Sequence, residues 1–239
     1  MKSQELKPTT RLLSVCSARM RPDLIMEMLK SFDKTKSEIS EMVIYVWKDD
    51  PKVKEYKKNL KGRNVIYGIK RFMTEVLNYV SIEVYPDVDY YQMINDDHYY
   101  LIEFWDKLMI EPLDKSNGWG ISFCKGINER SHPNAEVVSG KIVKALGYYI
   151  YPEFKQYSCE PYFVGLGIGI NRFFYIRGNI IDHRSINWGY FKSDDVHKYI
   201  YSNDEIANGN TALNNWNIHH KLSDIRKIIQ AIEKEAINK

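Results

Sequence analysis

The chain has 239 residues, and its 34 Lys and Arg against 31 Asp and Glu leave a formal charge of only +3. This length suits one α/β domain with a substantial core, and the small charge gives no argument of its own for a nucleic-acid partner. Three widely spaced cysteines exclude a disulfide framework, and no apolar run reaches the ~20 residues of a membrane span. We therefore expect a protein of a reducing cytoplasm (the host cytoplasm if the gene is viral) with no membrane partner.

Strand and helix patterns alternate along the first hundred residues. Patterns typical of buried strands fall at 11–17, 42–47, 65–68 and 90–94, and helical patterns fall at 22–32, 52–61 and 70–84. Pro22 suits the first turn of the first helix. This β-α-β-α-β-α-β order predicts an α/β fold with a mostly parallel sheet and helices on its faces.

The patterns of the second half are less regular. They predict helices at 101–110, 137–146 and about 219–238, and strands at 119–123 and 176–181. Within 160–170 three glycines alternate with apolar residues. Ile170 stands where a dinucleotide fingerprint would have its third glycine, so we expect a bent or close-packed strand instead. Residues 187–217 are expected to be irregular.

Polar clusters follow three of the predicted strands, at the ends where a parallel sheet binds its ligands. The clusters are Ser17, Arg19 and Arg21; Asp49 and Asp50; and Asp96, Asp97 and His98. Because the strands are parallel, we expect the three clusters to converge.

The third cluster has the composition of a metal site. Two adjacent carboxylates that lose hydration are costly unless a cation lies beside them. Carboxylate oxygens with an adjacent imidazole suit Mn²⁺ or Mg²⁺, which usually holds a substrate diphosphate as well. A polar turn after a strand is the other interpretation of Asn95-Asp96-Asp97.

The order of these clusters resembles that of nucleotide-sugar-dependent glycosyltransferases with the GT-A fold, and of family 2-like members in particular. The resemblance covers roughly residues 10–200 and is carried by Leu13–Arg19 with Arg21-Pro22, Ile44–Asp50, Asn95–His98 and Ile181–His183. It implies one domain over 1–239, with a nucleotide-binding half at about 10–100, an acceptor half at about 101–215 and a C-terminal helix at about 219–238. The family motif is Asp-x-Asp, from which Asp96-Asp97-His98 departs, so either Asp97 or His98 could bind the metal directly.

The resemblance also implies roles for the donor-site residues. Ser17 and Arg19 would line the base and ribose of a UDP-sugar, with Arg21 and Asp96 in the same nucleotide site. Asp49 or Asp50 would contact the uracil or the ribose. Asp97, with His98 beside it and His183 from a later strand, would hold Mn²⁺ or Mg²⁺ against the diphosphate.

An inverting transfer also needs a general base for the acceptor hydroxyl. The family places a carboxylate near an acceptor-binding loop, and Glu160 matches that position best. Glu153 and Asp195 are rivals for the role. The alternative interpretation of Glu160 is an ordinary loop carboxylate.

The sequence is compatible with more than one kind of acceptor. Eight Lys or Arg between 52 and 71, opposed only by Glu55, indicate either a solvated helix face or a surface that follows nucleic-acid phosphates. The resemblance extends to phage-type enzymes that are expected to glycosylate hydroxymethylated pyrimidines in DNA. A cytoplasmic enzyme of surface-glycan assembly is a second interpretation. A binding module without catalysis is a third, because fold does not fix function.

Overall fold

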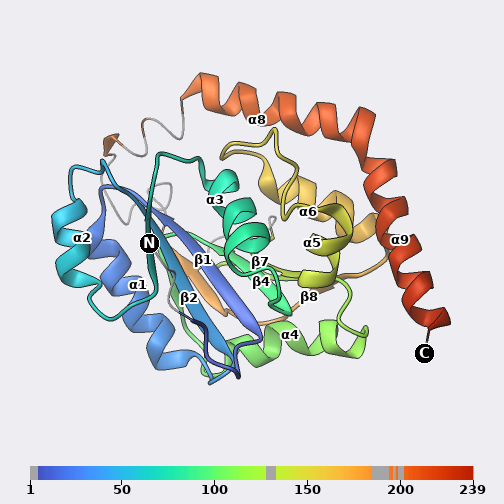
Figure 1. The fold of residues 1–239 in the computed structure, drawn as a ribbon, viewed down its shortest axis with the longest axis horizontal. Coiled ribbons are helices and arrows are strands. Elements are labelled where there is room, and N and C mark those ends of the chain that lie inside the picture. The colour runs from blue at the N-terminus through green and yellow to red at the C-terminus, as the bar shows by residue number, and fades with distance from the viewer. Residues whose placement is uncertain (1–4, 128–132, 185–193, 196–197, 199–201, 239) are drawn as a thin grey trace.

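The computed structural model in Figure 1 describes residues 5–127, 133–184, 194–195, 198 and 202–238. Within these ranges a sheet of seven strands has the order β3-β2-β1-β4-β7-β6-β8. The strands are β1 (Leu12–Ala18), β2 (Ser40–Trp47), β3 (Val65–Gly68), β4 (Tyr90–Ile94), β6 (Ile121–Cys124), β7 (Asn134–Ser139) and β8 (Phe173–Tyr175). The first four are parallel, β7 is antiparallel to β4 and β6, and β8 is parallel to β6. The predicted mostly parallel sheet is confirmed.

Helices cover both faces of the sheet (Figure 1). On one face lie α1 (Pro22–Thr35), α2 (Val53–Asn59) and α4 (Trp105–Lys115). On the other lie α3 (Met73–Tyr79), its π-helical continuation η1 (Val80–Val84), α5 (Gly140–Leu146) and α6 (Cys159–Gly169). Alternate residues of β1 enter the two cores, since Leu12 and Cys16 pack toward α1 while Leu13 and Val15 pack toward α3. Burial on both faces explains why these parallel strands are mostly apolar and do not alternate between apolar and polar residues.

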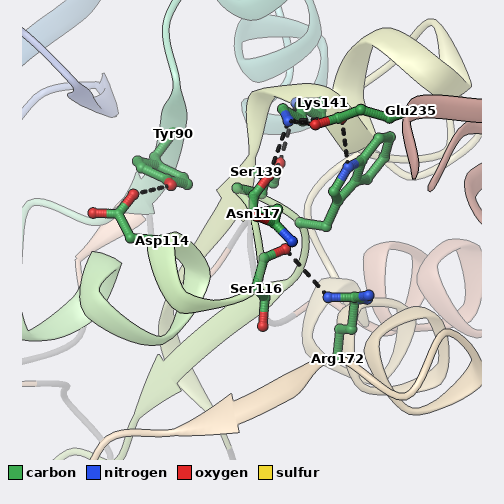
Figure 2. A network of polar contacts seen from close by, with 10 residues as sticks. Tyr90, Asp114, Ser116, Asn117, Ser139, Lys141, Arg172 and Glu235 are labelled. Atoms are coloured by element: carbon green, nitrogen blue, oxygen red, sulfur yellow. Dashed lines mark hydrogen bonds and ion pairs between the residues drawn. The ribbon is translucent and has the colours of Figure 1, made fainter. Parts of the chain in front are cut away.

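The C-terminal part of the chain wraps around the α5 and α6 side (Figure 1). It consists of α8 (Asn203–Asn215), the π-helical turn η3 (Trp216–His220) and α9 (Lys221–Ile237). Figure 2 shows how its end is fixed: both carboxylate oxygens of Glu235 lie 2.7 Å from Nζ of Lys141, which also donates to the carbonyl of Asn117. Glu235 also accepts a hydrogen bond from the indole of Trp119. The last helix is therefore attached to α5 by a partly buried ionic contact.

Several predictions for the second half are wrong. Residues 137–139 belong to β7, and the helix begins only at Gly140, where Oγ of Ser139 accepts a hydrogen bond from the Lys141 amide. The expected strand at 176–181 is replaced by β8 and by β9 (Ile181–His183) on either side of it. The expected irregular region contains α8, while its residues 187–193, 196–197 and 199–201 lie outside the described part of the chain.

The glycine-rich segment at 160–170 is helix α6 and not a strand, and packing explains its glycines. A Cβ on Gly167 would lie 2.5 Å from the ring of Phe173, and one on Gly169 would lie 2.2 Å from Ile225. The glycines therefore allow β8 and α9 to approach the helix closely. In the described ranges no helix combines the length and the apolar composition needed to cross a membrane.

Candidate donor and metal site

A small second sheet brings the candidate metal ligands together. Strand β5 (His98–Tyr100) pairs antiparallel with β9, and the register places His98 opposite His183. Asp97 precedes β5 directly. One ligand atom from each of these three residues lies within 4.8 Å of the other two. Residues far apart in the sequence thus meet at the carboxyl end of β4.

Burial and charge fit this cluster to a cation. Oδ1 of Asp97 lies 3.5 Å from Nε2 of His183 and accepts no hydrogen bond from the described residues. Burial acts to raise the pKa of Asp97, but the contacts with His183 and His98 outweigh it and lower that pKa. Burial, followed by the charge of Asp97, raises the pKa of Asp96. A buried carboxylate beside two imidazoles is a complete set of three protein ligands for a divalent ion.

Arg21 connects the first polar cluster to the third. Its guanidinium is buried, with Nη1 3.4 Å from Oδ1 of Asp96. Its Nε and Nη2 donate to the two carboxylate oxygens of Asp194, each at 2.7 Å. A fork-to-fork pair of this kind fixes the orientation of both groups. The ends of β1 and β4 therefore meet, as the sequence predicted.

The second polar cluster contacts the first through Asp50. This buried carboxylate accepts hydrogen bonds from the Met20 amide at 2.9 Å and from the Lys52 amide at 2.7 Å. It thus holds the turn that carries Arg19 and Arg21. The carboxylate of Asp49, in contrast, is exposed. Of the two aspartates, Asp49 is better placed to contact a ligand.

Ser17 and Arg19 lie at the same edge of the sheet. Ser17 is half-buried near the end of β1, and it pairs in register with Tyr45 of β2. The guanidinium of Arg19 lies 4.4 Å from the ring centroid of Trp47, at the end of β2. The two residues therefore lie at the carboxyl end of β1, beside the end of β2.

The three candidate bases have different surroundings. Glu160 is half-buried in the first turn of α6 and lines a groove of about 600 Å³. Glu153 is exposed and accepts a hydrogen bond from Asn215, and Asp195 is exposed and pairs with Lys198. A general base needs room for a substrate beside it, and this favours Glu160.

Two residues of the site have no signal in the sequence. Asp194 holds Arg21, yet the sequence singles out its neighbour Asp195. Asn134 opens β7, and its amide nitrogen lies 3.4 Å from Nδ1 of His183. This contact restrains the orientation of the His183 ring. Neither role follows from local patterns, because each depends on a partner far along the chain.

No family model and no curated protein sequence matches the chain. Several solved structures, in contrast, are similar to it. TarS of S. aureus (residues 1–349) superposes with a TM-score of 0.56 at 13% identity, over 93% of this chain and 81% of TarS. TarS in complex with UDP-GlcNAc superposes with a TM-score of 0.53 at 12% identity, over 93% of this chain and 79% of TarS. Glucosyl-3-phosphoglycerate synthase of Mycobacterium tuberculosis, solved with Mn²⁺, UDP and phosphoglyceric acid, superposes with a TM-score of 0.53 at 12% identity. The superposition covers 75% of this chain and 74% of the synthase. Similarity at such low identity establishes the architecture, and the chain has the GT-A fold.

Proposed function

We propose that this protein is an inverting glycosyltransferase that moves a sugar from a UDP-sugar to an acceptor hydroxyl with the help of a divalent metal ion. The observation that carries the proposal is the buried cluster of Asp97, His98 and His183 at the carboxyl end of β4. The fold supports it as well, since TarS was solved with UDP-GlcNAc and the mycobacterial synthase with Mn²⁺ and UDP.

The ligand set favours Mn²⁺ over Mg²⁺. Two of the three ligand atoms are imidazole nitrogens, whereas Mg²⁺ prefers an all-oxygen shell. Asp97 and His183 would hold the ion with His98, and Asn134 would orient His183. When bound, the ion neutralises charge that develops on the UDP leaving group.

The chain's own residues would perform the remaining steps. Ser17, Arg19 and Asp49 would contact the base and ribose, and Arg21 would keep Asp96 in place beside the diphosphate. Glu160 would accept the proton of the acceptor hydroxyl while that oxygen forms a bond to the anomeric carbon. The bond from that carbon to the UDP oxygen breaks in the same step, on the opposite face of the sugar, which inverts the configuration.

Thermal unfolding with UDP, GDP or CDP, each with and without Mn²⁺, tests the donor site. A ligand at a hundred times its Kd stabilises the folded state by about 2.7 kcal/mol, or about 5–10 °C for a chain of this size. We expect this rise for UDP with Mn²⁺ and a much smaller one for the other combinations. If no nucleotide raises the melting temperature, a structural turn becomes the better interpretation of Asp96-Asp97.

We also propose an acceptor half at about 101–215, and hydroxymethylated pyrimidine in DNA as one acceptor to be screened. The support for DNA is the basic stretch from 52 to 71, which lies outside that half. Nζ of Lys70 lies 5.4 Å from the ring centroid of Trp47, and Nζ of Lys57 lies 5.6 Å from that of Tyr67. Exposed Lys and Arg side chains supply affinity for phosphates that does not depend on base sequence. A surface glycan is the alternative acceptor.

Salt dependence tests the DNA proposal. Each phosphate contact should contribute about −0.9 to the slope of log affinity against log salt. Replacement of Lys54, Lys58 and Lys61, which are exposed, by Gln should weaken duplex binding and reduce that slope by about one for each lost contact. Lys234→Gln, an exposed change on α9, is the control. Weak binding that does not depend on salt would instead direct the search to glycans.

A further inference from the structure

The groove beside Glu160 lies between α6 and the C-terminal helices. Its floor is the outer stripe of α6, where Val164, Gly165 and Ile168 follow Glu160 at helical spacing. Leu213 and Lys221 contribute to the opposite side. Its volume of about 600 Å³ is within the range of small-molecule sites.

Helix α6 is apolar on both faces. Its inner face, with Tyr162, Phe163 and Leu166, is fully buried in the core. Its outer face continues with apolar side chains and glycine, and Ile168 is 65% exposed. A helix that is apolar all round is normally covered on all sides. The outer stripe therefore suits an apolar occupant.

The opposite side of the groove carries a cation whose position is fixed. Nζ of Lys221 lies 5.6 Å from the ring centroid of Trp216, and it would be 3.3 Å from a Cβ on Gly165. Trp216 is completely buried and donates its indole N–H to Asp224, which is itself buried and also accepts from Tyr148. These contacts hold the start of α9, and Lys221 with it, over the floor of the groove.

The groove extends from the candidate base toward this cation. Glu160 and Gly165 are five positions apart on α6, which corresponds to about 7.5 Å along the helix axis. Pro133 lines the groove, and the next residue, Asn134, contacts His183 of the metal cluster. One side of the groove is therefore adjacent to the donor site, while Lys221 stands further along α6.

We propose that this groove is the acceptor subsite and that it binds an anionic acceptor with an apolar body. The acceptor hydroxyl meets Glu160, the apolar body lies on Val164 and Ile168, and the anionic group pairs with Lys221. Lys221 is the one cation among the described residues that line the groove, so it selects for a ligand with an anionic group. This inference rests on the proposed function, because it assigns the substrate of the same site.

The test uses two dyes that share an apolar body. Anilinonaphthalene sulfonate carries an anionic group, and its parent phenylnaphthylamine carries none. Both report binding by fluorescence without UDP or turnover. We expect Lys221→Gln to weaken binding of the sulfonate about tenfold and to leave the neutral dye unaffected. Ile168→Glu should weaken both. Lys234→Gln and Ile237→Glu, exposed changes on α9, should alter neither.

A second readout connects the groove to the reaction. With UDP-sugar and Mn²⁺, the bound sulfonate should slow the release of UDP to water, because it displaces water from Glu160. Lys221→Gln should need about tenfold more dye for the same effect. The Mn²⁺-dependent stabilisation by UDP is measured for every variant, so that failure of the donor site is seen separately.

Three outcomes would overturn the assignment. In the first, Lys221→Gln binds the sulfonate as tightly as the parent chain. In the second, saturating dye leaves UDP release unchanged, so that the groove is remote from the reaction. In the third, size-exclusion chromatography shows a dimer that Ile168→Glu separates, which would mean that a second copy covers the groove.

Discussion

Replacing Asp97 with Ala should lower sugar transfer by at least about a hundredfold and remove the Mn²⁺-dependent part of the UDP stabilisation. Asp97 supplies the carboxylate oxygen in a cluster whose other ligand atoms are the imidazole nitrogens of His98 and His183. Loss of several kcal/mol of charge stabilisation in the transition state corresponds to such a factor. UDP release with Mn²⁺ and melting temperature with UDP are the measurements.

Two further variants make the Asp97 result interpretable. Asp97→Asn keeps the shape of the side chain and removes its charge, so it should reproduce the loss of activity even if Ala disturbs folding. Asp87→Ala changes an exposed carboxylate that pairs only with Lys144 among the described residues, and it should behave like the parent chain. Transfer that survives in Asp97→Ala would show that the metal hypothesis is wrong. A parent chain that binds UDP and transfers no sugar to any acceptor would support the binding-module interpretation.

Glu160→Gln should retain donor binding and lose transfer by a factor of about 10²–10⁴. The amide has nearly the shape of the carboxylate but cannot accept the proton of the acceptor hydroxyl. Glu160 stands in the first turn of α6 and is not one of the three candidate metal ligands, so stabilisation by UDP with Mn²⁺ should match that of the parent chain. Initial rates at saturating UDP-sugar, together with the melting temperature, separate these two effects.

The rival carboxylates provide the controls for Glu160. Glu153→Gln and Asp195→Asn change exposed groups, and both should keep most of the transfer activity. If Asp195→Asn lost transfer while Glu160→Gln kept it, the base would be Asp195. The same pattern with Glu153→Gln would assign the base to Glu153.

The first half of the fold could be predicted because its signals are local. Residues 42–47 of β2 are an unbroken apolar run, and Pro22 marks the start of α1 as expected. Parallel strands also have their carboxyl ends on one edge, so the meeting of Arg21 and Asp96 follows from strand order.

The second half could not be predicted in the same way, because distant contacts determine it. Gly167 and Gly169 are unfavourable in a helix, so the sequence does not indicate one here. Helix α6 nevertheless forms, and the missing side chains at these two positions leave room for Phe173 and Ile225. Val137 and Val138 lie just before α5 and also fit a helical pattern. Their pairing with β4 and β6 makes them part of strand β7 instead. The roles of Asn134 and Asp194 could not be predicted for the same reason, because their partners His183 and Arg21 are far away in the sequence.

The pairing of Arg21 with Asp194 has a consequence for how the protein is made. The two residues are 173 positions apart, and they form one of the contacts that surround the candidate donor site. During synthesis the residues of strands β1 to β8 are all made before Asp194 exists. The partner that holds Arg21 beside Asp96 is therefore supplied only when most of the chain has left the ribosome, and truncation of the chain before Asp194 would remove this contact from the site.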